Sequence, residues 1–184
     1  MADIDWEAAA NHWIEKEPDE ARMPREELTS EIDGFLARHK VCALACAGAG
    51  IVRNTPVEYL YAEGAFWIFS EGGLKFKALR ERRDVCLAIF DDDPSFGSLA
   101  GLQVTGRAEV LEPFGGEYAH ACELKGIPIE RLEKLPFAMN IIKVAPARYD
   151  YLDSSLKKRG FSSRQHIDFD AASDACTSDS ARRM

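Results

Sequence analysis

Residues 66–91 read FWIFSEGGLKFKALRERRDVCLAIFD, and this stretch decides how the rest of the chain is interpreted. The aromatic run that ends at Ser70 predicts a strand, and the apolar run at residues 85–90 predicts another. The glycine pair at 72–73 predicts a tight turn, because glycine adopts backbone angles that other residues resist. A short basic helix begins near Leu74 and fills the space between the turn and the second strand.

A strand, a glycine turn and a helix start together predict a site for an anion. The first amides of a helix have no intrahelical partner and point outward. The helix dipole adds partial positive charge at the same place, and Lys75 adds a full charge. We therefore expect this turn to hold a phosphate group.

Composition limits the classes of protein to which the chain can belong. Its 184 residues fit one main domain, and 46% hydrophobic residues are enough for a sizeable core. A formal net charge of -8 argues against nucleic acid and anionic membranes as partners. No apolar run approaches the roughly 20 residues that a membrane helix needs, and the acidic N-terminus does not resemble a signal peptide.

The five cysteines indicate a reducing compartment. They form no Cys-x-x-Cys motif, their number is odd, and most of them lie in apolar, strand-like runs. Buried, reduced thiols in a cytoplasmic protein are the interpretation that these features favour.

The order of expected elements predicts an α+β fold with a largely antiparallel sheet. Helices are expected at residues 5–17, 24–39, 74–82 and 113–124, and strands at 41–47, 51–61, 66–70, 85–90, 99–111 and 137–152, the last as one strand or a strand pair. Pro56 predicts an edge, a bulge or a strand end, and Gly106 predicts a bulge or sharp bend. Such a sheet is long enough to close into a small barrel.

Several common catalytic motifs are missing from the sequence. Lys75 is followed by Phe76 where a Walker loop needs Ser or Thr, and no dinucleotide-binding glycine fingerprint follows a strand. The four histidines lack the spacing of a zinc site, and the acidic residues 91–93 are better explained as a solvated loop than as a cation site. We expect no metal.

Polar side chains at strand ends complete the anion site. Arg53 lies in the second strand, Ser70 and Lys75 follow the third, and Gln103 lies inside the long strand. Each has an ordinary explanation as a surface residue. Together they supply a bidentate phosphate donor, a hydroxyl, a lysine and an amide, and an amide can pair with the edge of a heterocycle.

The chain resembles the FMN-binding split barrels of the pyridoxamine 5′-phosphate oxidase-like superfamily across roughly residues 28–152. The likeness rests on residues 53–58 (RNTPVE), 69–79 (FSEGGLKFKAL), 85–90 (VCLAIF) and 102–110 (LQVTGRAEV). It is similar to flavin-nucleotide-binding members that carry an N-terminal helical extension and a late segment such as 162–166 (SSRQH).

The resemblance implies a six-stranded antiparallel split β-barrel with flanking helices, which dimerises and binds FMN between subunits. It implies cofactor-binding residues Arg53, Asn54, Thr55, Pro56, Val57, Ser70, Leu74, Lys75 and Gln103. Arg53 and Lys75 would take the phosphate, and Gln103 would contact the flavin from the partner-facing strand. Leu74 stands where the oxidase proper has an arginine, so the resemblance supports flavin binding more than that enzyme's own reaction.

Three functions stay open at this stage. The first is an FMN-dependent oxidoreductase with a small-molecule substrate, for which we name no catalytic residue. The second is a haem-binding or haem-degrading split barrel with His166 as axial ligand, and the third is a non-catalytic flavin-binding dimer. In each case we expect an N-terminal helical extension at residues 1–23, a barrel domain at 24–168 and a disordered tail at 169–184.

Overall fold

The structure is a computed structural model that describes residues 4–93, 95 and 97–169. Of the tail expected from residue 169 onward, all but Phe169 lies outside the described residues. Phe169 itself continues the pairing of residues 164–168 with residues 148–152, since its amide donates to the carbonyl of Ala147 at 2.9 Å.

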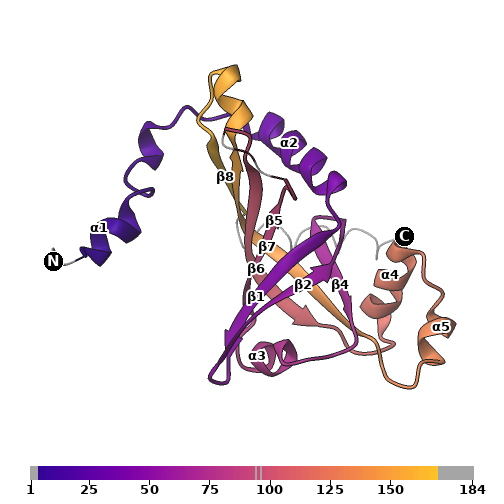
Figure 1. Cartoon of the computed structure of the whole chain (residues 1–184). Helices are drawn as coiled ribbons and strands as arrows, with labels where there is room; N and C mark the ends of the chain where they lie inside the picture. The colour runs from indigo at the N-terminus through magenta and orange to yellow at the C-terminus, as the bar shows by residue number, and fades with distance from the viewer. Residues whose placement is uncertain (1–3, 94, 96, 170–184) are drawn as a thin grey trace, which may run out of the picture.

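One antiparallel sheet curls into a split barrel (Figure 1). Within the described residues its strands are β1 (Val41–Gly48), β2 (Ile51–Glu58), β3 (Leu60–Ala62), β4 (Ala65–Ser70), β5 (Asp84–Phe90), β6 (Ala100–Val110), β7 (Asn140–Asp153) and β8 (Arg164–Asp168). The strand order is β2-β1-β5-β6-β7-β4-β3, and β8 pairs with β7. The α+β class and the split barrel predicted from the sequence are confirmed.

Helices flank this sheet rather than alternate with its strands. They are α1 (Trp6–Asn11), η1 (Glu17–Asp19), α2 (Arg25–Arg38), α3 (Lys75–Glu81), α4 (Gly116–Lys125), α5 (Ile129–Glu133) and η2 (Ser154–Arg159), where η marks a 3₁₀ helix. In Figure 1, α3 lies at one end of the barrel and α1 projects to the side, away from the sheet. None of the helices in the described part of the chain is long and apolar enough to cross a membrane.

Two apolar clusters hold the elements together. The larger one fills the barrel and includes Phe66 and Ile68 from β4 and Phe35 from α2. The smaller one lies on the other side of β4, where Trp67 is buried with Tyr118 of α4. Because β4 is buried on both faces, it appears in the sequence as a continuous apolar run.

The sheet has eight strands among the described residues, so the expected count of six was wrong. The expected strand 51–61 divides into β2 and β3 at Tyr59. The amide of Tyr59 donates to the Lys40 carbonyl at 2.9 Å, and its hydroxyl donates to the Leu36 carbonyl at 3.2 Å. These bonds turn Tyr59 toward α2 and interrupt the ladder. The second additional strand is β8.

Two sequence expectations about strand irregularities are confirmed. Pro56 lies in β2, which is at one end of the strand order and therefore has a free edge. At Gly106 the pairing of β6 with β7 shifts register. A Cβ atom at Gly106 would lie 2.5 Å from the carbonyl oxygen of Ala145, so the strands approach too closely for a side chain.

The N-terminal helix differs from the expectation. A helix was expected over 5–17 with one face in the local core, but α1 ends at Asn11 and has no buried residue. Trp6 is 74% exposed and Ile14 is 64% exposed. The apolar residues have the spacing of an amphipathic helix, yet most of their surface is exposed, and the described contact is that of Arg164 over the ring of Trp13 at 4.2 Å.

Candidate functional site

Lys75, the first residue of α3, is buried beside the glycine turn. Its side chain is 6% exposed, and its ammonium group donates to the carbonyl of Gly72. The hydroxyl of Ser70 donates to the same carbonyl at 3.4 Å. Gly73 has a φ of +112°, and a Cβ there would lie 3.5 Å from the Lys75 ammonium nitrogen. The turn therefore places a cation and a hydroxyl around a backbone that only glycine suits.

No carboxylate within the described residues forms an ion pair with Lys75. Burial lowers the pKa of Lys75, and the nearby Cys46 thiol opposes this shift. A buried ammonium group is stabilised by an anionic partner. The described groups around Lys75 are the Gly72 carbonyl, the Ser70 hydroxyl, the Cys46 thiol and the Phe76 ring, and none is a carboxylate, so the site suits an anion.

Arg53 lies in the same environment as Lys75, because both residues are close to Cys46. Arg53 and Cys46 are partners in the ladder between β1 and β2, and paired residues project from the same side of a sheet. Burial raises the pKa of the Cys46 thiol, whereas the charges of Lys75 and Arg53 pull it down. Two cations thus flank one thiol, and Thr55 alternates with Arg53 on the same side of β2.

Gln103 and two other predicted residues lie on the opposite, outer side of the sheet. Gln103 pairs with Ala88 in β5, and Ala88 pairs with Ala43 in β1, which in turn pairs with Pro56. This row projects away from the barrel interior, and Asn54 shares its side of β2 by alternation. Within one chain, the structure therefore separates Gln103, Asn54 and Pro56 from Lys75 and Arg53.

The remaining predicted residues have simpler positions. Val57 lies on the inner side of β2 as the ladder partner of Cys42. Leu74 precedes α3 as its N-cap residue and is 55% exposed. Because its side chain offers no hydrogen-bonding group, α3 begins without a side-chain cap, and the amides of Phe76 and Lys77 donate instead to the carbonyls of Gly73 and Leu74, both at 3.1 Å.

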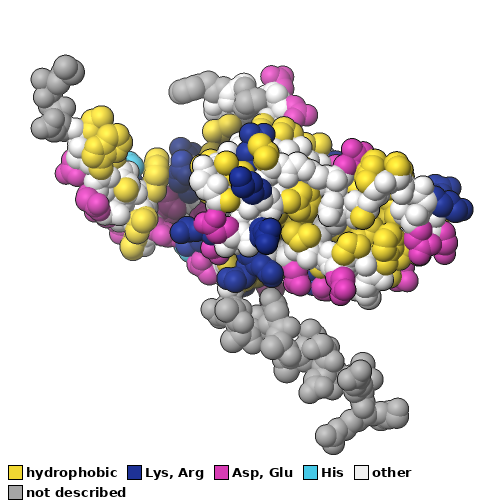
Figure 2. Space-filling model, turned by 90° about the horizontal axis from the view of Figure 1, so that it is seen from below, with side chains coloured by type: hydrophobic (Ala, Val, Ile, Leu, Met, Phe, Trp, Pro, Cys, Tyr) yellow, Lys and Arg dark blue, Asp and Glu magenta, His cyan; other side chains and the backbone are white. Residues whose placement is uncertain are grey.

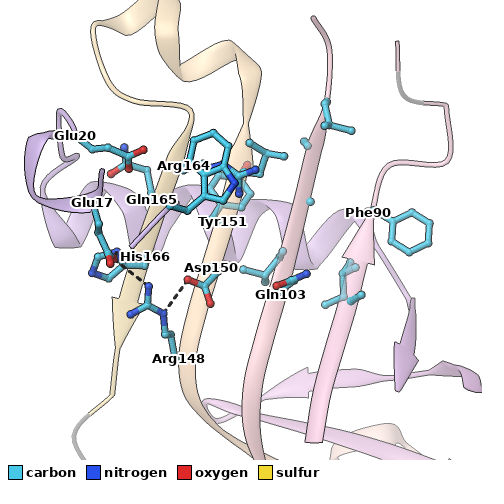
Figure 3. Close-up of a pocket in the computed structure, with 18 of the residues that line it drawn as sticks. Glu17, Glu20, Phe90, Gln103, Arg148, Asp150, Tyr151, Arg164, Gln165 and His166 are labelled. Carbon is cyan, nitrogen blue, oxygen red and sulfur yellow. Dashed lines mark hydrogen bonds and ion pairs between the residues drawn. The ribbon is translucent and has the colours of Figure 1, made fainter. Parts of the chain in front are cut away.

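A cleft of about 480 Å³ opens over the outer side of the sheet. Gln103 lies on its floor, and the strands β5 to β8 and the segment after α1 line it (Figure 3). Arg148 is its main charged residue: it donates to Asp150 at 2.8 Å and to Glu17 at 3.0 Å. Sequence reasoning missed this group. Arg148 and Asp150, two apart on a strand and hence on one face, were the available signal.

His166, the candidate haem ligand, lies at the same cleft with both ring nitrogens beside carboxylates. Its Nδ1 contacts Glu17, and its Nε2 lies 3.6 Å from Asp168. The ring is therefore part of an ion-pair network that joins the N-terminal segment to β8. The described residues contain no group of three or more His, Cys, Asp and Glu side chains that could hold a metal ion.

The fold is that of a split barrel, and comparison with known protein families agrees. The family model described as pyridoxamine 5′-phosphate oxidase matches residues 28–153. The chain belongs to this family. No curated protein matches it.

Solved structures share the fold at low sequence identity. An FAD-binding protein from Mesorhizobium loti is 20% identical, with 66% of this chain and 89% of that chain covered and a TM-score of 0.52. A putative pyridoxamine 5′-phosphate oxidase from Listeria innocua is 19% identical, with 68% and 98% covered and a TM-score of 0.54. The haem storage protein HutZ from Vibrio cholerae is 17% identical, with 64% and 88% covered and a TM-score of 0.52. At these identities the likeness establishes the fold alone.

Proposed function

We propose that this protein binds FMN as a homodimer and acts as a flavin-dependent oxidoreductase on a small molecule. Family membership and the FAD-binding relative support a flavin, and the turn at Lys75 supports one that ends in a phosphate. Leu74 makes the cradle less cationic than that of the oxidase proper, which favours a different substrate.

The observation that carries the proposal is the buried charge of Lys75. The residue is 6% exposed, and its ammonium group has no carboxylate partner in the described chain. A phosphate oxygen would complete its hydrogen bonds and neutralise its charge. Ser70 and Arg53 would bind the same group.

The homodimer follows from the position of Gln103. One molecule cannot bring Gln103 and Lys75 to the same ligand, because they lie on opposite sides of its sheet. In a dimer built on the outer sheet face, the phosphate site of one protomer and the Gln103 amide of its partner would meet the two ends of one FMN. The small side chains of Ala43 and Ala88 would allow close approach there.

The flavin ring, when bound, supplies hydride transfer. The residues of this chain would hold it: Lys75 and Arg53 at the phosphate, the backbone of residues 54–57 along the ring, and Gln103 at the heterocycle edge. The free thiols of Cys42, Cys46, Cys86 and Cys122 favour a reducing compartment such as the cytoplasm.

Haem binding is the weaker alternative. The HutZ relative favours it, since that protein is a haem storage protein. Ligation through His166 would require its ring to leave Glu17 and Asp168. A haem titration of the protein and of His166→Ala tests this: we expect no Soret shift that depends on His166.

Titration with FMN tests the proposed function. Lys75→Met should weaken FMN binding roughly 10- to 100-fold, as expected when a charge-assisted phosphate contact is lost. Lys40→Ala removes one positive charge from an exposed position and serves as the control, with affinity unchanged. Equal affinity of Lys75→Met and the unaltered protein would place the phosphate elsewhere. Bound FMN that no pyridine nucleotide reduces would identify a non-catalytic flavin-binding dimer.

A further inference from the structure

The segment of residues 4–20, here called the N-terminal arm, carries apolar side chains that are half or more exposed, although Arg164 lies over the ring of Trp13 at 4.2 Å. Ile4 is 63% exposed, Trp6 74%, Trp13 50% and Ile14 64%. Figure 2 shows the arm standing off the body, with hydrophobic and acidic side chains on its surface. Exposed apolar area of this kind on an ordered segment marks an interaction surface.

The arm is also strongly acidic. Residues 4–20 contain six carboxylates and one lysine, Lys16. Glu17 and Glu20 form ion pairs with basic residues, whereas Glu7, Glu15 and Asp19 form none within the described chain. A surface that is both apolar and acidic fits a partner that offers positive charge.

The root of the arm is fixed to the barrel, so the arm presents this surface in a defined place. Glu17 is bound by Arg148 at 3.0 Å and by Arg22 at 3.2 Å. The amide of Ala21 donates to the hydroxyl of Ser162 at 3.0 Å. These bonds tie the arm to β7 and to the turn before β8, at the end of the barrel that is distant from α3 in Figure 1.

The complementary charge lies around α3, and we call it the basic face. Its exposed members are Lys77, Arg80, Arg82, Arg83 and Arg107. None of them has a carboxylate within ion-pair distance among the described residues. Asp84 pairs with Arg107 in the ladder of β5 and β6, which places the end of α3 beside β6. Figure 2 shows Lys and Arg side chains gathered over the middle of this face, away from the arm.

We propose that the N-terminal arm of one protomer docks on the basic face of a second copy of this chain. A chain's own arm projects from the side of its barrel and lies apart from α3 (Figure 1), so we assign the contact between arm and basic face to two molecules. Two-fold symmetry then gives the same contact twice, since each protomer supplies one arm and one basic face. The proposal rests on the homodimer of the proposed function and adds a second contact to it, between the N-terminal arm and the basic face.

The apolar area and the charge of the arm both favour a second copy of this chain as its partner. The exposed parts of two tryptophans and two isoleucines amount to roughly 400 Å² of apolar area, about half of what one partner of a standard interface buries. An anionic membrane surface would repel the acidic arm. Because α3 begins at Lys75, a docked arm would also cover the phosphate cradle of the other protomer and shield it from water.

Charge reversal followed by mixing tests the contact. One variant reverses the arm, Glu7→Lys with Glu15→Lys, and the other reverses the basic face, Arg80→Glu with Arg83→Glu. Sedimentation at low salt should show a dimer dissociation constant at least tenfold higher for each variant alone, because both contacts become repulsive. An equimolar mixture should recover dimers, because each arm then meets an opposite charge. Glu130→Lys with Glu133→Lys on α5 is the matched control and should leave the dimer unchanged.

The outcomes separate this inference from the proposed function. If the unaltered protein is a dimer and the reversals leave its dissociation constant unchanged, or the mixture fails to recover dimers, the arm docks elsewhere and only this inference is overturned. If the unaltered protein stays monomeric at high concentration, the homodimer itself is wrong. High salt should weaken the unaltered dimer, because the contact is electrostatic.

Discussion

At the scale of single residues, Lys75 is a buried charge in an unfavourable environment. Burial lowers its pKa, which means that the fold disfavours the charged form. Cys46 and the Gly72 carbonyl are its only close polar neighbours that the structure identifies. We infer that this unfavourable environment is kept because a phosphate ligand relieves it.

Lys75→Met should therefore stabilise the ligand-free protein while it weakens FMN binding. We expect a gain of roughly 1–2 kcal/mol in the free energy of unfolding, since an apolar side chain of similar length replaces an unpaired buried charge. The folded pKa lies below the unfolded one, so the penalty is complete below the folded pKa and fades as pH rises toward the unfolded value. Urea unfolding of both proteins at several pH values measures this, and a gain that grows with pH would contradict the account.

At the scale of secondary structure, the register shift of β6 against β7 depends on a glycine. A Cβ at Gly106 would meet the Ala145 carbonyl oxygen at 2.5 Å, and this contact cannot relax without moving a strand. Gly106→Ala should cost about 1–3 kcal/mol of unfolding free energy. Gly34→Ala is the matched control: in α2 its nearest neighbour would be the Arg38 side chain at 3.6 Å, and we expect a gain of about 0.5–1 kcal/mol. Thermal unfolding distinguishes the expected loss of stability in Gly106→Ala from the expected gain in Gly34→Ala. A Gly106→Ala protein as stable as the unaltered one would show that β6 and β7 can separate there.

The N-terminal arm depends on one carboxylate. Burial by itself would raise the pKa of Glu17, but the hydrogen bond from Arg148 and the charges of His166, Arg148 and Arg22 lower it below its usual value. This stabilisation is present above the unfolded pKa of Glu17 and is lost as pH falls through the folded one.

Glu17→Gln should release the arm without unfolding the barrel. Amide hydrogen exchange in residues 5–20 should become faster than in the unaltered protein, with exchange in β5 and β6 unchanged. Glu20→Gln is the milder control, because Glu20 reaches only Arg22, at 3.9 Å. Unchanged exchange in Glu17→Gln would mean that the other contacts of the segment hold the arm.

The elements that the sequence predicted are those whose pattern is local. The aromatic strand β4, the glycine turn and the basic helix α3 follow from consecutive residues, and so do the edge position of Pro56 and the bend at Gly106. The strand β8 was missed because Gln165 takes an inward position where an apolar residue would reveal the pattern. Its amide group is buried and satisfied, since it accepts from Met23 at 2.9 Å and donates to Ser162 at 2.7 Å. Only the fold brings those partners together.

The candidate site was predictable to a similar degree. Residue types and spacing singled out Arg53, Lys75 and Gln103, and the structure places the first two around Cys46. Alternation along β2 and the pairing order decide that Gln103 lies on the other side of the sheet. Spacing could have paired Arg148 with Asp150, but the contact of Arg148 with Glu17 could not be predicted, because the two residues lie 131 positions apart in the chain.

At the scale of the whole molecule, the main feature is that the proposed ligand-binding residues lie on both sides of the sheet. The proposed phosphate cradle lies on one side and the Gln103 amide on the other, so the FMN site that we propose needs two protomers. The uncovered arm and the unpaired basic face are then two halves of a second contact between the same protomers. One assembly thus accounts for three features that a monomer leaves unexplained.

Native mass spectrometry of the protein with added FMN tests this central claim most directly. We predict two chains of 20.5 kDa each that carry two FMN molecules, and loss of both FMN molecules when Gln103→Ala and Lys75→Met are combined. A monomer that binds FMN, or a dimer that remains free of FMN at saturating concentration, would contradict the account.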